Sequence, residues 1–107
     1  MIYELRVYDI MPGKGGELNK RFQDVTSKYF KKYGIKEIGY WTNLAGPGGY
    51  LTYMLAYESM EDREQKWAKF SADTERRALF AESEKNGPLI RNVSNQFLQP
   101  TAFSPLK

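Results

Sequence analysis

Five aromatic side chains with polar tips are the first residues that could support chemistry or ligand binding. They are Tyr40, Trp41, Tyr53, Tyr57 and Trp67. Phenol hydroxyls and indole N–H groups suit a flat, apolar ligand, because the rings supply contact area and the polar tips fix its orientation. The sequence therefore predicts an aromatic-lined pocket for a small apolar or aromatic molecule between helices and sheet. For any single one of these residues, packing in the core or at a dimer interface is the alternative and the more common role.

Three charged residues are further candidates for the same site. Glu4 and Arg6 are two positions apart and would share one face of a strand, where buried charges must be matched. They could form an acid–base or anion-holding pair, but we prefer an ion-pair network across a dimer interface. Arg63 could hold a carboxylate ligand through two donors of its planar guanidinium. We favour the alternative that Arg63 fastens a helix to the sheet.

The chain contains neither cysteine nor histidine. Without cysteine there are no disulfides, zinc–thiolate sites, iron–sulfur clusters or cysteine nucleophiles. Without histidine the commonest general base and metal ligand are missing, and so is a proximal ligand for haem. The carboxylates show no metal-ligand spacing, so we predict no metal and no cofactor. Only Glu, Asp, Lys and Tyr remain for acid–base work.

Four segments carry the β-favouring residues and the alternation that predict strands. These segments are 1–10, 35–44, 50–58 and 89–99. The segment 50–58 is apolar on both faces, so we expect both of its faces to be covered. The segment 89–99 is more polar, which is typical of an edge or partner-facing strand.

Two helical regions separate the strands. An apolar stripe at steps of three and four predicts an amphipathic helix over 17–33, with Gly34 as its C-terminal stop. A second helical run starts after Ser59, a predicted N-cap. A break near 71–74 divides this run, and Asp73 or Thr74 would cap its second piece.

The order βαββαβ predicts an α+β fold of the ferredoxin-like type, a four-stranded antiparallel sheet with helices on one face. The other face cannot be fully polar, because the strands over 35–44 and 50–58 carry apolar residues on both sides. A second copy of the chain is the simplest cover, since most soluble oligomers are symmetric homodimers. We therefore expect a homodimer whose sheets pack face to face, a dimeric α/β barrel.

Length and charge limit the remaining possibilities. A chain of 107 residues suits one domain, which we place at 1–99, followed by an extended C-terminal tail at 100–107. The net charge of +3 comes without a dense lysine or arginine stripe, so we do not expect nucleic-acid binding. No apolar run is long enough to span a membrane. No leader precedes the first strand, so we expect a cytoplasmic protein.

Several short motifs, in order along the chain, resemble the NIPSNAP family. They are Ile2-Tyr3-Glu4-Leu5-Arg6-Val7-Tyr8 with Pro12-Gly13-Lys14, Gly39-Tyr40-Trp41-Thr42 before Gly46-Pro47, Ala56-Tyr57-Glu58-Ser59 before Asp62-Arg63, and Leu98-Gln99-Pro100 before Phe103-Ser104-Pro105. The resemblance covers nearly the whole chain and is that of a small bacterial-type NIPSNAP domain. It implies a ferredoxin-like domain of the dimeric α/β-barrel superfamily, which also contains small monooxygenases, isomerases and haem-degrading enzymes. This chain lacks the histidine that many of those enzymes use.

Two functions from different classes fit the sequence. The first is binding of a small apolar or aromatic molecule, with a cofactor-independent oxygenase or isomerase reaction as its enzymatic form. The second is a non-catalytic protein-interaction module, which the absence of His, Cys and any catalytic motif favours. An enclosed pocket with an inward polar group would support the first function, and a solidly packed interior would count against it.

Overall fold

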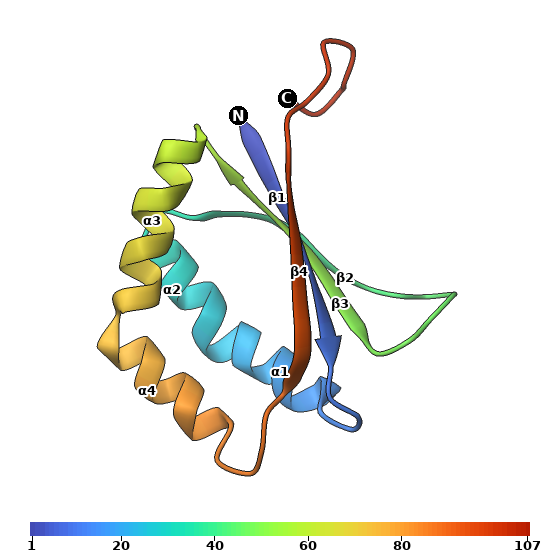
Figure 1. Ribbon diagram of the computed structural model, residues 1–107, viewed down its shortest axis with the longest axis vertical. Helices are drawn as coiled ribbons and strands as arrows, with labels where there is room; N and C mark the ends of the chain where they lie inside the picture. Colours follow the sequence, from blue (N-terminus) through green and yellow to red (C-terminus); the bar gives the residue numbers. More distant parts are fainter.

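The computed structural model describes residues 1–107, and its elements follow the predicted βαββαβ order (Figure 1). Every predicted strand is present, with slightly narrower bounds. The strands are β1 (Ile2–Ile10), β2 (Lys36–Thr42), β3 (Tyr50–Tyr57) and β4 (Ile90–Leu98). The helices are α1 (Gly15–Arg21), the π-helical segment η1 (Phe22–Thr26), α2 (Ser27–Lys32), α3 (Met60–Ala72) and α4 (Thr74–Ser83).

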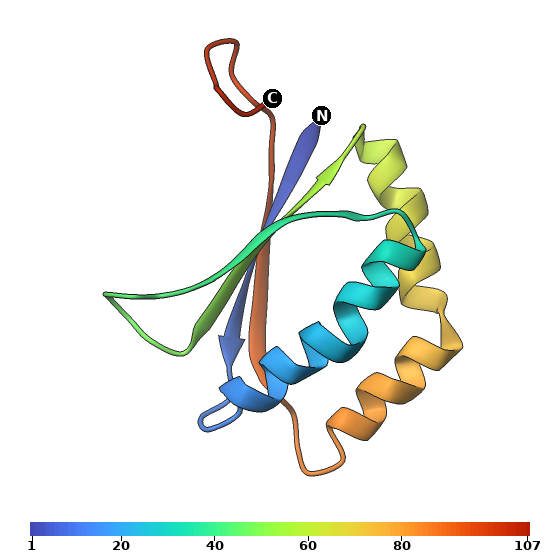
Figure 2. The same cartoon turned by 180° about the vertical axis from the view of Figure 1, so that it is seen from behind.

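The four strands form one antiparallel sheet in the order β2-β3-β1-β4. All helices lie on one face of this sheet, as the two opposite views in Figures 1 and 2 show. β1 and β3 are the central strands, and β2 and β4 are the edges. The prediction of a ferredoxin-like α+β fold is confirmed. None of the helices has the length and apolar character that crossing a membrane requires.

α1, η1 and α2 form one continuous helical rod, which corresponds to the helix predicted over 17–33. Phe30 is fully buried against the sheet and anchors the end of this rod. Gly34 has a φ of 72°, and the Ile35 N–H donates to the Phe30 carbonyl at 2.8 Å. This left-handed stop is the one expected at Gly34, because a glycine has no Cβ to clash in that conformation.

The π-helical turn η1 was not predicted from the apolar stripe. It begins directly after Arg21, and Arg21 and Phe22 are both buried although they are adjacent in the sequence. π turns are rare and occur mostly as single wide turns inside α-helices, frequently at functional sites. Here the turn lies where Phe22 packs on the tyrosines of the sheet, while Arg21 beside it packs on Phe80 and Ser83 of α4.

Side-chain caps begin both of the later helices. The Ser59 Oγ accepts a hydrogen bond from the Asp62 N–H at 3.1 Å, which confirms the predicted N-cap of α3. Asp73 has an extended backbone between α3 and α4, and its carboxylate accepts from the Arg76 N–H at 2.8 Å. Asp73 is therefore the cap of α4. Both caps satisfy N–H groups that have no partner within their helix.

β4 is the strand that the helix layer leaves uncovered. Its inner face, toward the helices, carries Val93, Asn95 and Phe97, and all three are exposed. Val93 retains 42% and Phe97 41% of its accessible surface. The inner face of β4 is therefore apolar in part and open to solvent, whereas the inner faces of β1 and β3 are buried.

The outer face of the sheet carries no helix. Leu5, Val7 and Met54 lie there and are half-buried in the single chain. Trp41 is 51% exposed on the same face, and its indole lies across Gly39. A Cβ added to Gly39 would come within 2.8 Å of the Trp41 ring, so the missing side chain makes room for the indole.

Asp73 also joins α2 to the α3–α4 corner, because it accepts hydrogen bonds from the Tyr33 hydroxyl and from Lys32 Nζ. The Tyr33 hydroxyl, the Arg76 N–H and Lys32 lower the pKa of Asp73 from its usual 3.8. A carboxyl whose pKa is lowered by folding stabilises the fold above its ordinary pKa and loses that effect as the pH falls. We expect Asp73→Ala to lower the melting temperature at neutral pH, and the difference from wild type to shrink below about pH 4.

Thermal unfolding followed by circular dichroism across this pH range measures the effect of Asp73. Asp24→Ala is a matched control, because Asp24 is about half exposed and is paired with Lys20 at 3.3 Å. Exposed pairs contribute little to stability, so this variant should melt close to wild type at every pH. A melting difference for Asp73→Ala that does not change with pH would contradict the assignment.

Candidate functional site

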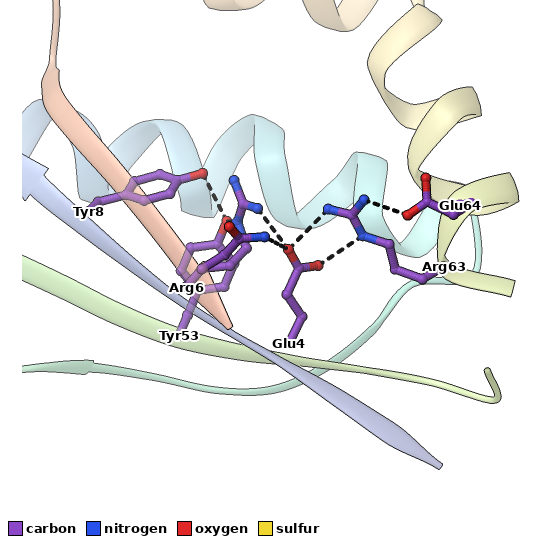
Figure 3. Close-up of polar contacts among 7 residues, drawn as sticks. Glu4, Arg6, Tyr8, Tyr53, Arg63 and Glu64 are labelled. Carbon is purple, nitrogen blue, oxygen red and sulfur yellow. Dashed lines mark hydrogen bonds and ion pairs between the residues drawn. The ribbon is translucent and has the colours of Figure 1, made fainter. Parts of the chain in front are cut away.

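A buried carboxylate lies at the centre of the inner face of the sheet (Figure 3). Glu4 of β1 is fully buried and accepts four hydrogen bonds. They come from Arg6 Nη1 (2.9 Å), Arg63 Nη2 and Nε (3.0 and 3.2 Å) and Asn95 Nδ2 (2.9 Å). Burial alone would raise the pKa of Glu4, but these hydrogen bonds and the charge of Arg6 lower it.

The preferred sequence interpretation of the Glu4–Arg6 pair was wrong. It placed the pair in an ion-pair network across a dimer interface, whereas both side chains face the helix layer of their own chain. Alternation along β1 puts them on one face but does not say which face meets the helices. The expectation for Arg63 is confirmed, since it joins α3 to β1 through two hydrogen bonds to Glu4.

Trp67 of α3 lies between the two arginines of this cluster. The guanidinium carbons of Arg6 and Arg63 are 4.6 and 4.7 Å from the centre of its indole ring. The guanidinium carbon of Arg63 is also 5.0 Å from the centre of the Phe97 ring on β4. Cations at this distance from an aromatic ring are attracted to its face. The cluster thus extends from the buried carboxylate to the exposed inner face of β4.

Two tyrosine hydroxyls extend the network from Arg6 in the other direction. Arg6 Nε donates to the Tyr53 hydroxyl at 2.7 Å, and the Tyr53 and Tyr8 hydroxyls are 2.8 Å apart (Figure 3). The rings of Phe22 and Tyr40 pack around this pair, with centres 5.1 and 5.3 Å from that of Tyr53. Burial raises the pKa of Tyr53 well above its ordinary value. Burial and the hydrogen bond to the Glu37 carboxylate likewise raise the pKa of Tyr40.

The structure brings most of the predicted site residues together on the inner face. Those on this face are Arg6, Tyr40, Tyr53, Tyr57, Arg63 and Trp67. The buried Tyr57 hydroxyl has no hydrogen-bond partner in the protein, and burial together with the charge of Glu4 raises its pKa. Trp41 is on the outer face, apart from the others.

Sequence reasoning did not include Tyr8, Phe22 or Asn95 among the site residues. Tyr8 could have been found, because alternation along β1 puts it on the same face as Glu4 and Arg6. Phe22 was recognised only as part of an apolar stripe. Asn95 is 91 positions from Glu4, and nothing local to its strand indicates this contact.

The interior around the cluster is tightly packed, so the aromatic-lined pocket predicted between helices and sheet is not present as an enclosed cavity. The concavities of the surface are open grooves of about 230 to 350 Å³, and none is lined by Tyr53, Tyr57 or Trp67. Tyr40 and Phe22 line one groove of about 240 Å³. No three acidic side chains lie close enough together to hold a metal ion. The site is thus accessible at this groove and along its β4 flank, where Phe97 and Asn95 are exposed.

The fold and the cluster define a ferredoxin-like α+β domain with a charged and aromatic inner site. Comparison with known proteins agrees with this class. The family model of NIPSNAP matches residues 3–105, so the chain belongs to the NIPSNAP family. The search of curated proteins gave no match.

Solved structures support the same assignment. A NIPSNAP family protein from Agrobacterium tumefaciens is 30% identical, with a TM-score of 0.88 over 99% of this chain and 98% of that one. A NIPSNAP domain protein from Burkholderia xenovorans is 28% identical, with a TM-score of 0.86 over 98% and 99% of the two chains. A mutant of MhuD with two manganese protoporphyrin IX molecules bound per active site is 15% identical, with a TM-score of 0.65 over 94% of each chain. This last likeness is one of fold.

The Glu4 carboxylate should be essential for stability. In Glu4→Gln the guanidiniums of Arg6 and Arg63 lose their buried counter-charge, and removing one partner of a buried ion pair costs about 3 kcal/mol or more. Urea unfolding measures this loss as a change in the free energy of unfolding. Glu64→Gln is a matched control, because Glu64 pairs with Arg63 at 3.1 Å but its side chain is 64% exposed. It should cost less than about 1 kcal/mol, and equal losses in both variants would contradict the central role of Glu4.

Proposed function

We propose that the protein is a homodimer that binds a small apolar or aromatic molecule on the inner face of β4. The observation that carries this proposal is the exposure of Val93 and Phe97 beside a buried cluster of arginines and aromatic rings. A strand face left open by the helix layer would be expected to be polar throughout if it met only water. The proposed ligand covers these apolar side chains.

The register of the sheet aligns this open face with the cluster. Val93 pairs with Tyr8, and Phe97 pairs with Glu4. Directly opposed side chains in an antiparallel pair are about 5 Å apart. A flat molecule on the inner face of β4 would therefore lie beside Tyr8 and the Arg6 guanidinium of β1 along one edge. Arg63, over the Phe97 ring at 5.0 Å, supplies the end wall.

The groups of the cluster suit binding better than proton transfer. Burial raises the pKa of Tyr53, and burial together with the Glu37 hydrogen bond raises that of Tyr40, so neither is a base at neutral pH. Glu4 has a lowered pKa and accepts four hydrogen bonds, which makes it a poor proton acceptor. An oxygenase or isomerase reaction that needs a general base would have to find it elsewhere. We therefore propose binding as the function of this site.

The fold is shared with a protein that holds a large planar ligand. The mutant of MhuD has manganese protoporphyrin IX bound in its active site, and a domain of this fold can thus carry a flat aromatic molecule. This chain has no histidine to ligate a haem iron. We accordingly propose a metal-free aromatic molecule as the ligand.

The outer face of the sheet supports the homodimer part of the proposal. It presents Leu5, Val7 and Met54 from the two central strands, with the exposed indole of Trp41 at its edge. Contiguous apolar surface of this kind is typical of an interaction site. A two-fold pairing of identical faces would cover it on both chains at once.

A charge on the outer face should break this dimer. Met54→Glu places a carboxylate in the centre of the face, and two such charges would meet across a two-fold interface. We expect sedimentation equilibrium to show a dimer for wild type and a monomer for Met54→Glu. Gln23→Glu adds the same charge to the helix layer at an exposed position and should leave the dimer intact. A monomeric wild-type protein would contradict the proposal.

Native mass spectrometry of the purified protein tests the ligand directly. We expect a reproducible small-molecule mass on the wild type and its loss in Phe97→Ala, which removes an exposed ring beside the cluster. Phe103→Ala is the matched control, since Phe103 is 87% exposed in the C-terminal tail and should keep the bound mass. A ligand retained equally by both variants would contradict its placement on β4.

One observation favours the alternative, a non-catalytic protein-interaction module. The interior is tightly packed, and no enclosed cavity lies among Tyr53, Tyr57 and Trp67. A protein with no small molecule bound in native spectra, together with one reproducible protein partner in affinity purification, would shift the assignment to this module.

A further inference from the structure

The hydrogen-bond network of the cluster has more donors than acceptors at its Tyr8 end. The Tyr53 hydroxyl accepts from Arg6 Nε and is bonded to the Tyr8 hydroxyl. Whichever tyrosine donates in that bond, the other keeps a proton for which no protein acceptor is in place, because each hydroxyl carries one proton. A buried donor without an acceptor is unfavourable. An additional hydrogen-bond acceptor at this end of the network would therefore be favourable.

Two guanidiniums increase this surplus of donors. Arg6 uses Nε and Nη1 for Tyr53 and Glu4, and its Nη2 makes no hydrogen bond within the protein. The side chain of Arg21 is 5% exposed, and its Nε is buried without any partner. A guanidinium can donate five hydrogen bonds and accept none. An acceptor from outside the chain would satisfy the buried Nε of Arg21 and the unused Nη2 of Arg6.

Positive charge also gathers around this end of the site. Arg21 and Arg76 lie on the same ring, that of Phe80, with guanidinium carbons 4.3 and 4.5 Å from its centre. The carboxylate facing Arg21 is Glu84, at 3.7 Å. Burial lowers the pKa of Arg21, and the charge of Glu84 and the nearby Tyr8 hydroxyl offset this only in part. An anion here would face several guanidiniums in a poorly solvated setting, where their attraction is strongest.

We propose that the ligand carries an anionic group of the carboxylate class, bound by Arg6 and the Tyr8 hydroxyl where β1 borders β4, with its apolar part on the inner face of β4. This inference rests on the proposed function and names the substrate class for that site. A carboxylate offers only acceptors, which is what the surplus donors require. A neutral amide of the same shape brings an NH₂ donor to a place that already has too many. The site should therefore bind a carboxylic acid more tightly than its amide, because both charge and hydrogen bonding favour the acid.

A matched pair of probes tests the inference, namely 2-naphthoate and its neutral isostere 2-naphthamide. We expect isothermal titration calorimetry on the wild-type protein to show naphthoate binding at least about 10-fold more tightly, the scale of one charge-assisted hydrogen bond. Equal affinities would overturn the anionic inference and leave the proposed function standing. Failure of both probes to bind at up to about 1 mM would overturn the proposed function itself.

Tyr8→Phe then tests the position of the anionic group. The substitution removes one hydroxyl and keeps the ring that packs on Phe22 and Tyr53. We expect naphthoate to lose more affinity than naphthamide, so that the preference falls several-fold, because the hydrogen bond to a charged carboxylate is the stronger one. Tyr3→Phe makes the same deletion on the opposite face of β1 and should keep the full preference. A preference that survives unchanged in Tyr8→Phe would overturn the assigned position.

Discussion

The structure depends on one buried carboxylate that is shared by three elements. Glu4 on β1 holds Arg63 of α3, Asn95 of β4 and Arg6 of its own strand. A carboxylate in such a place is stable only when it is fully hydrogen-bonded. Glu4 thus links three features of the fold: the position of α3 over the sheet, the attachment of the edge strand β4 and the direction of the Arg6 side chain. None of them can change without leaving a buried charge unsatisfied.

The aromatic residues of the interior are arranged by this charged centre. Trp67 lies between the two guanidiniums that Glu4 holds, and the Tyr53 hydroxyl accepts from the Nε of Arg6. The remaining rings then pack edge to face or stacked around Tyr53, as Phe22 and Tyr40 do. Such contacts add to the area that the rings bury. The polar network and the apolar core are therefore one packing unit.

The fold was predictable from the sequence because it is encoded in local patterns. Strand alternation, the apolar helical stripe and the breakers at Gly34 and Asp73 each act over a few residues. The sequence also indicated which residues share a face of β1. It could not indicate which face meets the helices, since both faces of β3 are apolar, and this decided where Glu4 and Arg6 lie. The π turn at Phe22 and the Asn95 contact depend on tertiary packing and left no local signal.

The space that Gly39 leaves for the Trp41 indole has a consequence for fluorescence spectroscopy. The chain has two tryptophans, and the sheet separates them, with Trp41 on the outer face and Trp67 between the guanidiniums of the inner face. Each indole therefore reports on a different surface. Covering the outer face would remove the Trp41 indole from water and shift its fluorescence emission to shorter wavelength. A molecule bound at the inner site would instead change the quenching of Trp67 fluorescence. In variants that keep a single tryptophan, the fluorescence of that residue would report on one face of the sheet alone.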